Sequence, residues 1–166
     1  MTAAEKQRFF LDHLPHRVNL LIAFRERYSG RNPDRSLDPE RFRDLFRCAK
    51  DISMLMVRFF CAEVGLKVPK RQNTVQSCHP EGQAYGATKA NLGVISADSR
   101  FDSLRVVLIA ANRAVAHIEP SDVDHGVTDI VLICAIDLVE ELVRSQIYAP
   151  NNLSLNDAMK LPNNRM

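Results

Sequence analysis

Hydrophobic positions between residues 39 and 64 recur at steps of three and four, the spacing that places side chains along one face of an α-helix. Asp38 is a favourable N-cap, Pro39 suits the first helical position, and Gly65 supplies a stop. This pattern predicts an amphipathic helix, the longest well-capped element of the chain. Its apolar stripe is formed by Phe42, Leu45, Phe46, Ala49, Ile52, Met56, Phe59 and Phe60.

Similar periodicity predicts a helix on either side of this element. Pro15 opens or kinks a helix that continues through Tyr28, and we expect this helix to pair antiparallel with the helix over 39–64. A third amphipathic helix begins after Ser99, which can act as its N-cap, and ends near Ile118.

The last predicted helix begins at about Asp122 or Thr128 and ends at Tyr148. Between residues 130 and 139 it is apolar on most sides, more than one buried stripe requires. Since isologous pairing is the commonest way for a protein to cover such a surface, we expect a homodimer.

Residues 66–98 contain several prolines and glycines and little sustained periodicity, which predicts a long loop between the second and third helices. No segment alternates strongly enough to build a sheet. The expected fold is therefore all-α, an up-and-down bundle of four main helices. We expect residues 1–148 to form this single helical domain and residues 149–166, which are polar, to form a loose tail.

The composition fits one soluble domain and excludes several other classes. The chain has 166 residues, 46% of them hydrophobic, which is enough for a core without disulfide or metal staples. The four cysteines show no CxxC spacing, as expected for reduced thiols in a cytoplasmic protein. The longest apolar run, residues 130–136, is too short to cross a membrane, and no signal peptide is recognisable. The net charge of +2 does not by itself indicate a nucleic-acid partner.

Arg113 and His117 are the strongest candidates for chemistry. Four residues apart on a helix, their side chains project from the same face. A guanidinium grips phosphate oxygens, and an imidazole transfers protons near neutral pH. Basic residues at a helix end are also stabilised by the helix dipole, so a purely structural role is the alternative.

Two other groups of residues could bind a ligand, one a metal ion and the other a nucleic acid. His117, Asp122, Asp124 and His125 crowd one connector and carry side chains that suit zinc, iron or nickel, but their spacing matches no metal motif, so we expect no metal and no other cofactor. The loop over 66–98 is basic near Lys70 and Arg71. These residues with Tyr85 could track a nucleic-acid backbone and stack a base, or could form a solvated loop.

The segment AANRAVAHIEPSDVDH, followed by an apolar terminal helix, resembles the HEPN superfamily, especially its members related to abortive-infection proteins. The resemblance implies a helical, often dimeric, metal-independent ribonuclease whose arginine and histidine form a composite site. In this chain Arg113 and His117 would be the catalytic residues, with Asn112 as the adjacent polar residue. Asn112, Lys70 and Arg71 are the expected substrate-binding residues.

This resemblance also implies partners. RNA would be the substrate, and an antitoxin or another protein would be the partner of a defence or toxin system. The segment departs from the family pattern because only three residues separate Arg113 from His117, and Ala114 follows the arginine. A non-catalytic helical dimer that serves as an interaction module is therefore the alternative, followed by a metal-dependent bundle enzyme.

Overall fold

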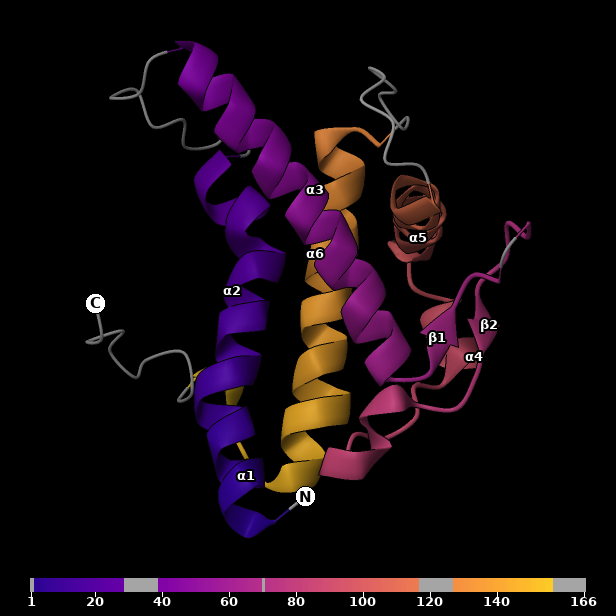
Figure 1. Ribbon diagram of the computed structural model, residues 1–166. Coiled ribbons are helices and arrows are strands. Elements are labelled where there is room, and N and C mark those ends of the chain that lie inside the picture. Colours follow the sequence, from indigo (N-terminus) through magenta and orange to yellow (C-terminus); the bar gives the residue numbers. More distant parts are fainter. Residues whose placement is uncertain (1, 29–38, 70, 117–126, 157–166) are drawn as a thin grey trace.

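The computed structural model describes residues 2–28, 39–69, 71–116 and 127–156, most of them helical (Figure 1). The longer helices are α2 (Leu14–Ala23), α3 (Pro39–Glu63), α5 (Phe101–Ala116) and α6 (Asp129–Leu142). The shorter helical pieces are α1 (Ala3–Arg8), η1 (Phe9–His13), η2 (Phe24–Tyr28), η3 (Glu81–Tyr85), α4 (Leu92–Ile95), η4 (Val143–Tyr148) and η5 (Ala149–Asn151). The two strands are β1 (Leu66–Lys67) and β2 (Gln76–Ser77). The prediction of a mostly helical protein is confirmed.

The chain begins with a helical rod that passes through Pro15 without a break. Thr2 and Glu5 form a capping box, each side chain accepting a hydrogen bond from the other's backbone N–H. A proline inside a helix lacks an N–H and its ring crowds the carbonyl one turn earlier. The rod accommodates this by winding wider over η1, where the Leu14 N–H donates to the Phe9 carbonyl five residues back.

Helix α3 matches the predicted long amphipathic helix closely. It ends at Glu63, and Gly65 adopts the left-handed conformation with φ of +79°. A Cβ at this position would lie 2.7 Å from the Cys78 carbonyl oxygen, so both the conformation and the close approach require glycine. Asp38, the predicted N-cap, lies outside the described residues.

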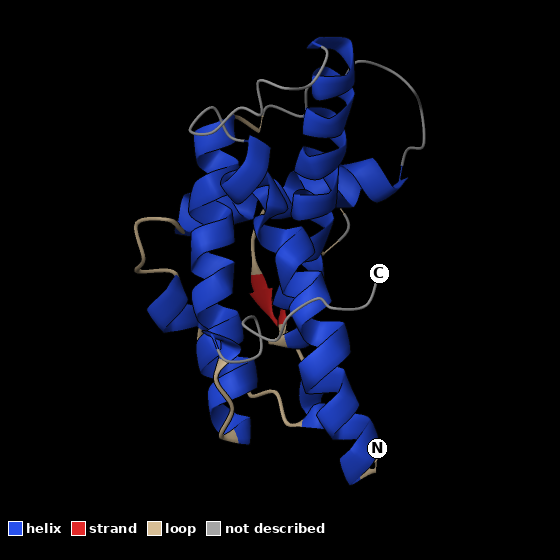
Figure 2. Ribbon diagram, turned by 90° about the vertical axis from the view of Figure 1, so that its left-hand side faces the viewer, coloured by secondary structure: helices blue, strands red, loops and turns tan. Residues whose placement is uncertain are grey.

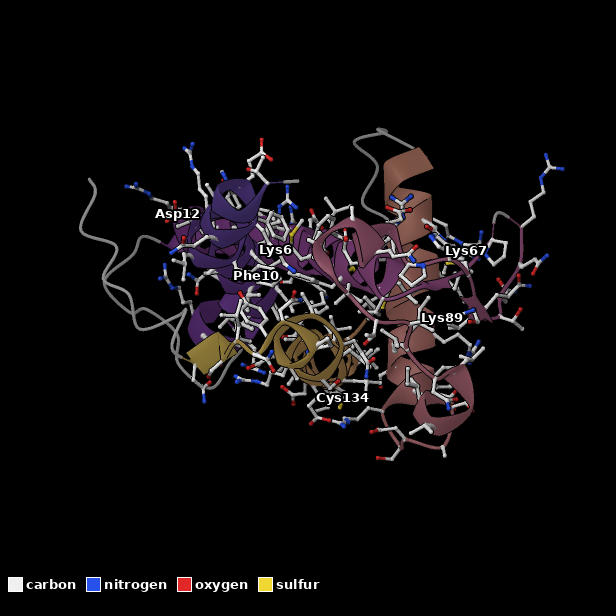
Figure 3. The ribbon with its side chains drawn as sticks, turned by 90° about the horizontal axis from the view of Figure 1, so that it is seen from below. Lys6, Phe10, Asp12, Lys67, Lys89 and Cys134 are labelled. Carbon is white, nitrogen blue, oxygen red and sulfur yellow. The ribbon has the colours of Figure 1, made fainter. Side chains whose placement is uncertain are left out.

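Helix α5 departs from a regular up-and-down bundle. In Figure 1, α2, α3 and α6 lie side by side, whereas α5 is seen along its own axis and therefore crosses them. Viewed from below, the same helix is seen from its side (Figure 3). Short loops force antiparallel neighbours, but the connection between α3 and α5 is long. As a result α2 and α3 are antiparallel as predicted, while α6 runs in the same direction as α3.

The predicted loop over 66–98 is folded over most of its length. β1 pairs antiparallel with β2, in the register Leu66 to Ser77 and Lys67 to Gln76. No strand was expected here, because two residues per strand are too few to produce an alternating pattern. Figure 2 shows this pair as the small red element among blue helices. The segment adds to the core the side chains of Leu66, Val68, Val75, Tyr85, Ala87, Ala90 and Ile95.

The core lies between α2, α3, α5 and α6. Leu108 on α5 and Ile133 and Leu138 on α6 are buried, as expected for the apolar positions of these helices. Phe46 and Phe59 are half-buried and pack against the core, and the side chain of Phe42 lies outside the described part. Burial of this apolar surface is the main favourable contribution to folding.

Polar contacts fix α2 and η2 against α6. The Arg25 guanidinium donates hydrogen bonds to the carboxylates of Asp137 and Glu140. After η4, the described chain continues to residue 156, and Leu155 is only 2% exposed. Within the predicted tail over 149–166, Asn151 also donates a hydrogen bond to the Ile147 carbonyl, while most of the described side chains are exposed. Residues 157–166 lie outside the described part, so the loose tail stays a prediction. None of the described helices is long and apolar enough to cross a bilayer.

Candidate functional site

Helix α5 presents a buried face to the core and carries Arg113 in its last turn. Before its first residue, the Asp98 carboxylate accepts a hydrogen bond of 2.8 Å from the Arg100 N–H. Ser99, the predicted N-cap, lies two residues before Phe101, where the helix begins. Leu104 and Leu108 form part of the buried face.

Arg113, a predicted catalytic residue, is exposed to solvent. His117, the other predicted catalytic residue, lies outside the described residues. The side-by-side placement of the two groups therefore stays a prediction.

Asn112, a predicted substrate-binding residue, faces the protein. Its side-chain Nδ2 donates a hydrogen bond of 2.9 Å to the backbone carbonyl of Val68, and the side chain is half-buried. This bond joins α5 to a segment 44 residues earlier in the chain. Sequence reasoning could not find it, because nothing in the local pattern around Asn112 indicates a distant carbonyl partner.

Residues 66–77, called the hairpin below, have a buried base and an exposed tip. Leu66, Val68 and Val75 are buried at the base, whereas residues 71–74 are all exposed. Arg71, at the tip, has a φ of +64°, the left-handed conformation that turns the chain. Lys70, its predicted neighbour in substrate binding, lies outside the described residues.

Three exposed cations lie on the hairpin and on the adjoining end of α5: Lys67, Arg71 and Arg113. Within the described part of the chain, none of them forms an ion pair. In Figure 3, Lys67 lies next to α5, on the opposite side of the molecule from Asp12. An exposed cation with no carboxylate partner can attract a phosphate group.

Tyr85, predicted as a base-stacking residue, is instead buried, so this interpretation is wrong. Its ring contacts Phe9 and Phe10, and its hydroxyl donates a hydrogen bond to the carboxylate of Glu63. Gly82 gives this hydroxyl room, since a Cβ there would lie 2.6 Å from it. The ring has no face available for a nucleic-acid base.

Glu63 is one of two polar residues buried among the described ones. Burial raises its pKa, while the hydrogen bond from Tyr85 and the charge of Arg17 act in the opposite direction, and the net pKa is above its ordinary value. Sequence reasoning missed this pair. The available signal was a glutamate beside the buried positions of a helix end, which does not identify its partner.

Metal ligands do not gather in the described part of the chain. No group of three or more histidine, cysteine, aspartate or glutamate side chains there could hold a metal ion. The candidate ligands His117, Asp122, Asp124 and His125 all lie outside the described residues. The absence of a metal site from this connector stays a prediction.

Comparison with known proteins identifies no relative. No protein-family model, curated protein or solved structure matches the chain significantly. Any functional assignment therefore depends on the chemistry of the residues themselves.

Proposed function

We propose that this chain is a HEPN-like helical protein that binds RNA at the surface formed by the hairpin and the end of α5. Supporting this is the exposure of Lys67, Arg71 and Arg113, none paired with a carboxylate in the described part, on two segments joined by the bond from Asn112 to Val68. Cationic side chains supply most of the affinity for a phosphate backbone.

The proposed activity is metal-independent cleavage of RNA in a defence or toxin system of the cytoplasm. The 2′-hydroxyl attacks the adjacent phosphorus and gives its proton to His117, the P–O5′ bond breaks, and the leaving oxygen takes up a proton. Arg113 stabilises the negative charge that develops on the phosphorane oxygens. The products are a 2′,3′-cyclic phosphate and a free 5′-hydroxyl.

The alternative is a non-catalytic module that binds RNA or a protein. The short spacing between Arg113 and His117 favours it, because the HEPN-like pattern has a longer spacer. An antitoxin or another partner protein would then be the ligand.

We expect the protein to form a homodimer whether it is a ribonuclease or a non-catalytic module. Most of the apolar surface of α6 is already buried within one copy, and Ile130, which is 58% exposed, is the part that remains for a partner. We expect a homodimer by light scattering, and Ile130→Ser should weaken it. A mass of 18.8 kDa across a wide concentration range would contradict the dimer.

A cleavage and binding assay on single-stranded RNA tests the function. In the presence of a chelator, wild type should cleave, and His117→Ala or Arg113→Ala should lower the rate by about 100-fold or more. The matched control is Arg8→Ala, an exposed arginine on α1, on the other side of the bundle from the hairpin (Figure 1). Its rate should equal that of wild type.

The three outcomes of this assay separate the proposals. Binding without cleavage would favour the non-catalytic module. Cleavage that a chelator abolishes would indicate a metal-dependent enzyme. If wild type neither binds nor cleaves RNA at low salt, where phosphate contacts are strongest, the RNA proposal is wrong.

A further inference from the structure

We infer that Asn112 is a positioning residue that fastens the hairpin to the end of α5, so that Arg71 and Arg113 bind one single-stranded RNA together. The inference rests on the proposed function and deepens it, because it assigns Asn112 a role through the protein. A direct contact between Asn112 and RNA was the expectation from sequence.

The side chains of Asn112 and Arg113 point in different directions. Consecutive residues on an α-helix point about 100° apart around the axis. The side-chain amide of Asn112 donates its hydrogen bond to the Val68 carbonyl, while Arg113 is exposed. One residue thus contacts the hairpin and the next is available to a ligand.

The hairpin needs contacts with the rest of the protein to keep its structure. Two strands of two residues each are far too short to be stable alone in water. Leu66, Val68 and Val75 anchor the base by burial. The bond from Asn112 is the side-chain hydrogen bond that joins the described part of the hairpin to α5. Together with the buried base, this bond therefore sets the orientation of the exposed tip relative to Arg113.

The tip of the hairpin carries side chains that suit single-stranded RNA. Its exposed residues are Arg71, Gln72, Asn73 and Thr74. Amide and hydroxyl groups pair with the edges of bases, and arginine binds phosphate. Base edges are accessible to such side chains in single-stranded RNA, whereas the deep major groove of an RNA duplex hides them. Single-stranded RNA is therefore the substrate class that fits.

The test compares the affinities of four proteins for a fluorescein-labelled oligouridine of on the order of 12 nucleotides. Asn112→Leu keeps the bulk of the side chain, removes the donor and adds no charge. It should weaken binding roughly fivefold, as should Arg71→Ala. The double variant should bind no more than about twofold more weakly than Arg71→Ala alone. If Asn112→Leu weakens binding by moving Arg71 away from the RNA, it has little further effect once the Arg71 side chain has been removed. Asn19→Leu, an exposed asparagine on α2, is the matched control and should bind like wild type.

A second measurement follows the attachment without RNA. Amide hydrogen exchange over residues 66–68 and 75–77 should be faster in Asn112→Leu than in wild type, and unchanged in Asn19→Leu. Losses that multiply in the double variant would mean that Asn112 contacts RNA directly, and unchanged exchange would mean that it does not hold the hairpin. Either result overturns the inference and leaves the proposed function standing. Absence of RNA binding by wild type overturns the proposed function, whatever the exchange data give.

Discussion

Two of the side-chain hydrogen bonds that attach the segment between α3 and α5 to the helices differ in environment. Near the end of α3, the Tyr85 hydroxyl bonds the Glu63 carboxylate in a buried site. Near the end of α5, the Asn112 amide bonds the Val68 carbonyl at a half-buried site beside exposed cations. Each is a single side-chain hydrogen bond over a long stretch of sequence, yet only the first lies among aromatic rings. Under the proposed function, the first attachment serves stability and the second holds a binding surface.

The buried attachment belongs to an aromatic cluster. Phe10 contacts the rings of Tyr85 and Tyr148 edge-on, with centroids 6.0 and 5.5 Å away. Phe9 lies against Tyr85 at 4.6 Å. Since these residues come from η1, η3 and η4, the cluster ties the first, middle and last described segments together.

Removal of the central ring of this cluster should have the largest effect. Phe10→Ala would leave a cavity between Tyr85 and Tyr148, and we expect a loss of about 3 to 5 kcal/mol in the free energy of unfolding. Chemical denaturation measures it. The matched control is Phe59→Ala, a half-buried phenylalanine under Arg17, which should cost clearly less. Equal losses in both variants would contradict a central role for the cluster.

Two tyrosine-to-phenylalanine changes should separate a hydrogen bond from ring packing. Tyr85→Phe leaves the buried Glu63 carboxyl without its donor and should cost about 1 to 3 kcal/mol. Tyr148→Phe is the control, because the buried Tyr148 hydroxyl has no partner in the described part of the chain. Its removal should leave stability unchanged or raise it by up to about 1 kcal/mol. Thermal unfolding of the two variants would contradict this account if Tyr148→Phe proved the less stable.

Local periodicity predicted the elements of this fold better than their arrangement. The bounds of helix α3 were predicted to within one residue, because its apolar periodicity, Pro39 and Gly65 indicate the same limits. Its stripe was predicted less well, since Ile52 is 37% exposed whereas Met54 and Val57 are buried. The crossing of α5 was not predicted, since it depends on how the segment before it folds. That segment consists of a hairpin and short helical turns, and it is buried by contacts with residues distant in sequence. Local hydrophobic patterns do not predict such contacts.

The candidate site was predicted in part for the same reason. The exposed cations Arg71 and Arg113 could be identified by residue type and position. The partner of Asn112 and the burial of Tyr85 could not be predicted, because the local sequence around a residue does not show whether its side chain is buried or which distant group it contacts. Glu63 illustrates the limit best, since a glutamate at a helix end is ordinarily exposed.

The contribution of the buried Glu63–Tyr85 attachment to stability should depend on pH. The groups that face Glu63 are Tyr85 and Glu81 of η3 and Arg17 of α2, and burial raises the pKa of Glu63 above its ordinary value of 4.5. The folded protein therefore holds this proton more tightly than the unfolded chain does. The resulting stabilisation is complete below pH 4.5 and is lost as the pH rises through the raised pKa.

Glu63→Gln tests this dependence because glutamine still accepts the hydrogen bond from Tyr85 and carries no charge. The variant should be more stable than wild type at pH 8, and the difference should shrink as the pH is lowered toward 4.5. Denaturant unfolding at several pH values measures it. The control is Glu81→Gln, an exposed neighbour, for which the difference from wild type should be smaller. A Glu63→Gln advantage that grows toward low pH would reverse the sign and contradict the argument.

The exposed attachment should give the smallest change in global stability. Asn112→Leu removes one half-buried hydrogen bond, and water can reach the vacated Val68 carbonyl once the base of the hairpin loosens, so the expected loss is about 0.5 to 1.5 kcal/mol. The midpoint of denaturation should therefore move less than in Tyr85→Phe, although both variants lose one bond from the same segment. If Asn112→Leu were as destabilising as Tyr85→Phe, both attachments would be parts of the core. The distinction between a stabilising end and a binding end of residues 66–98 would then be wrong.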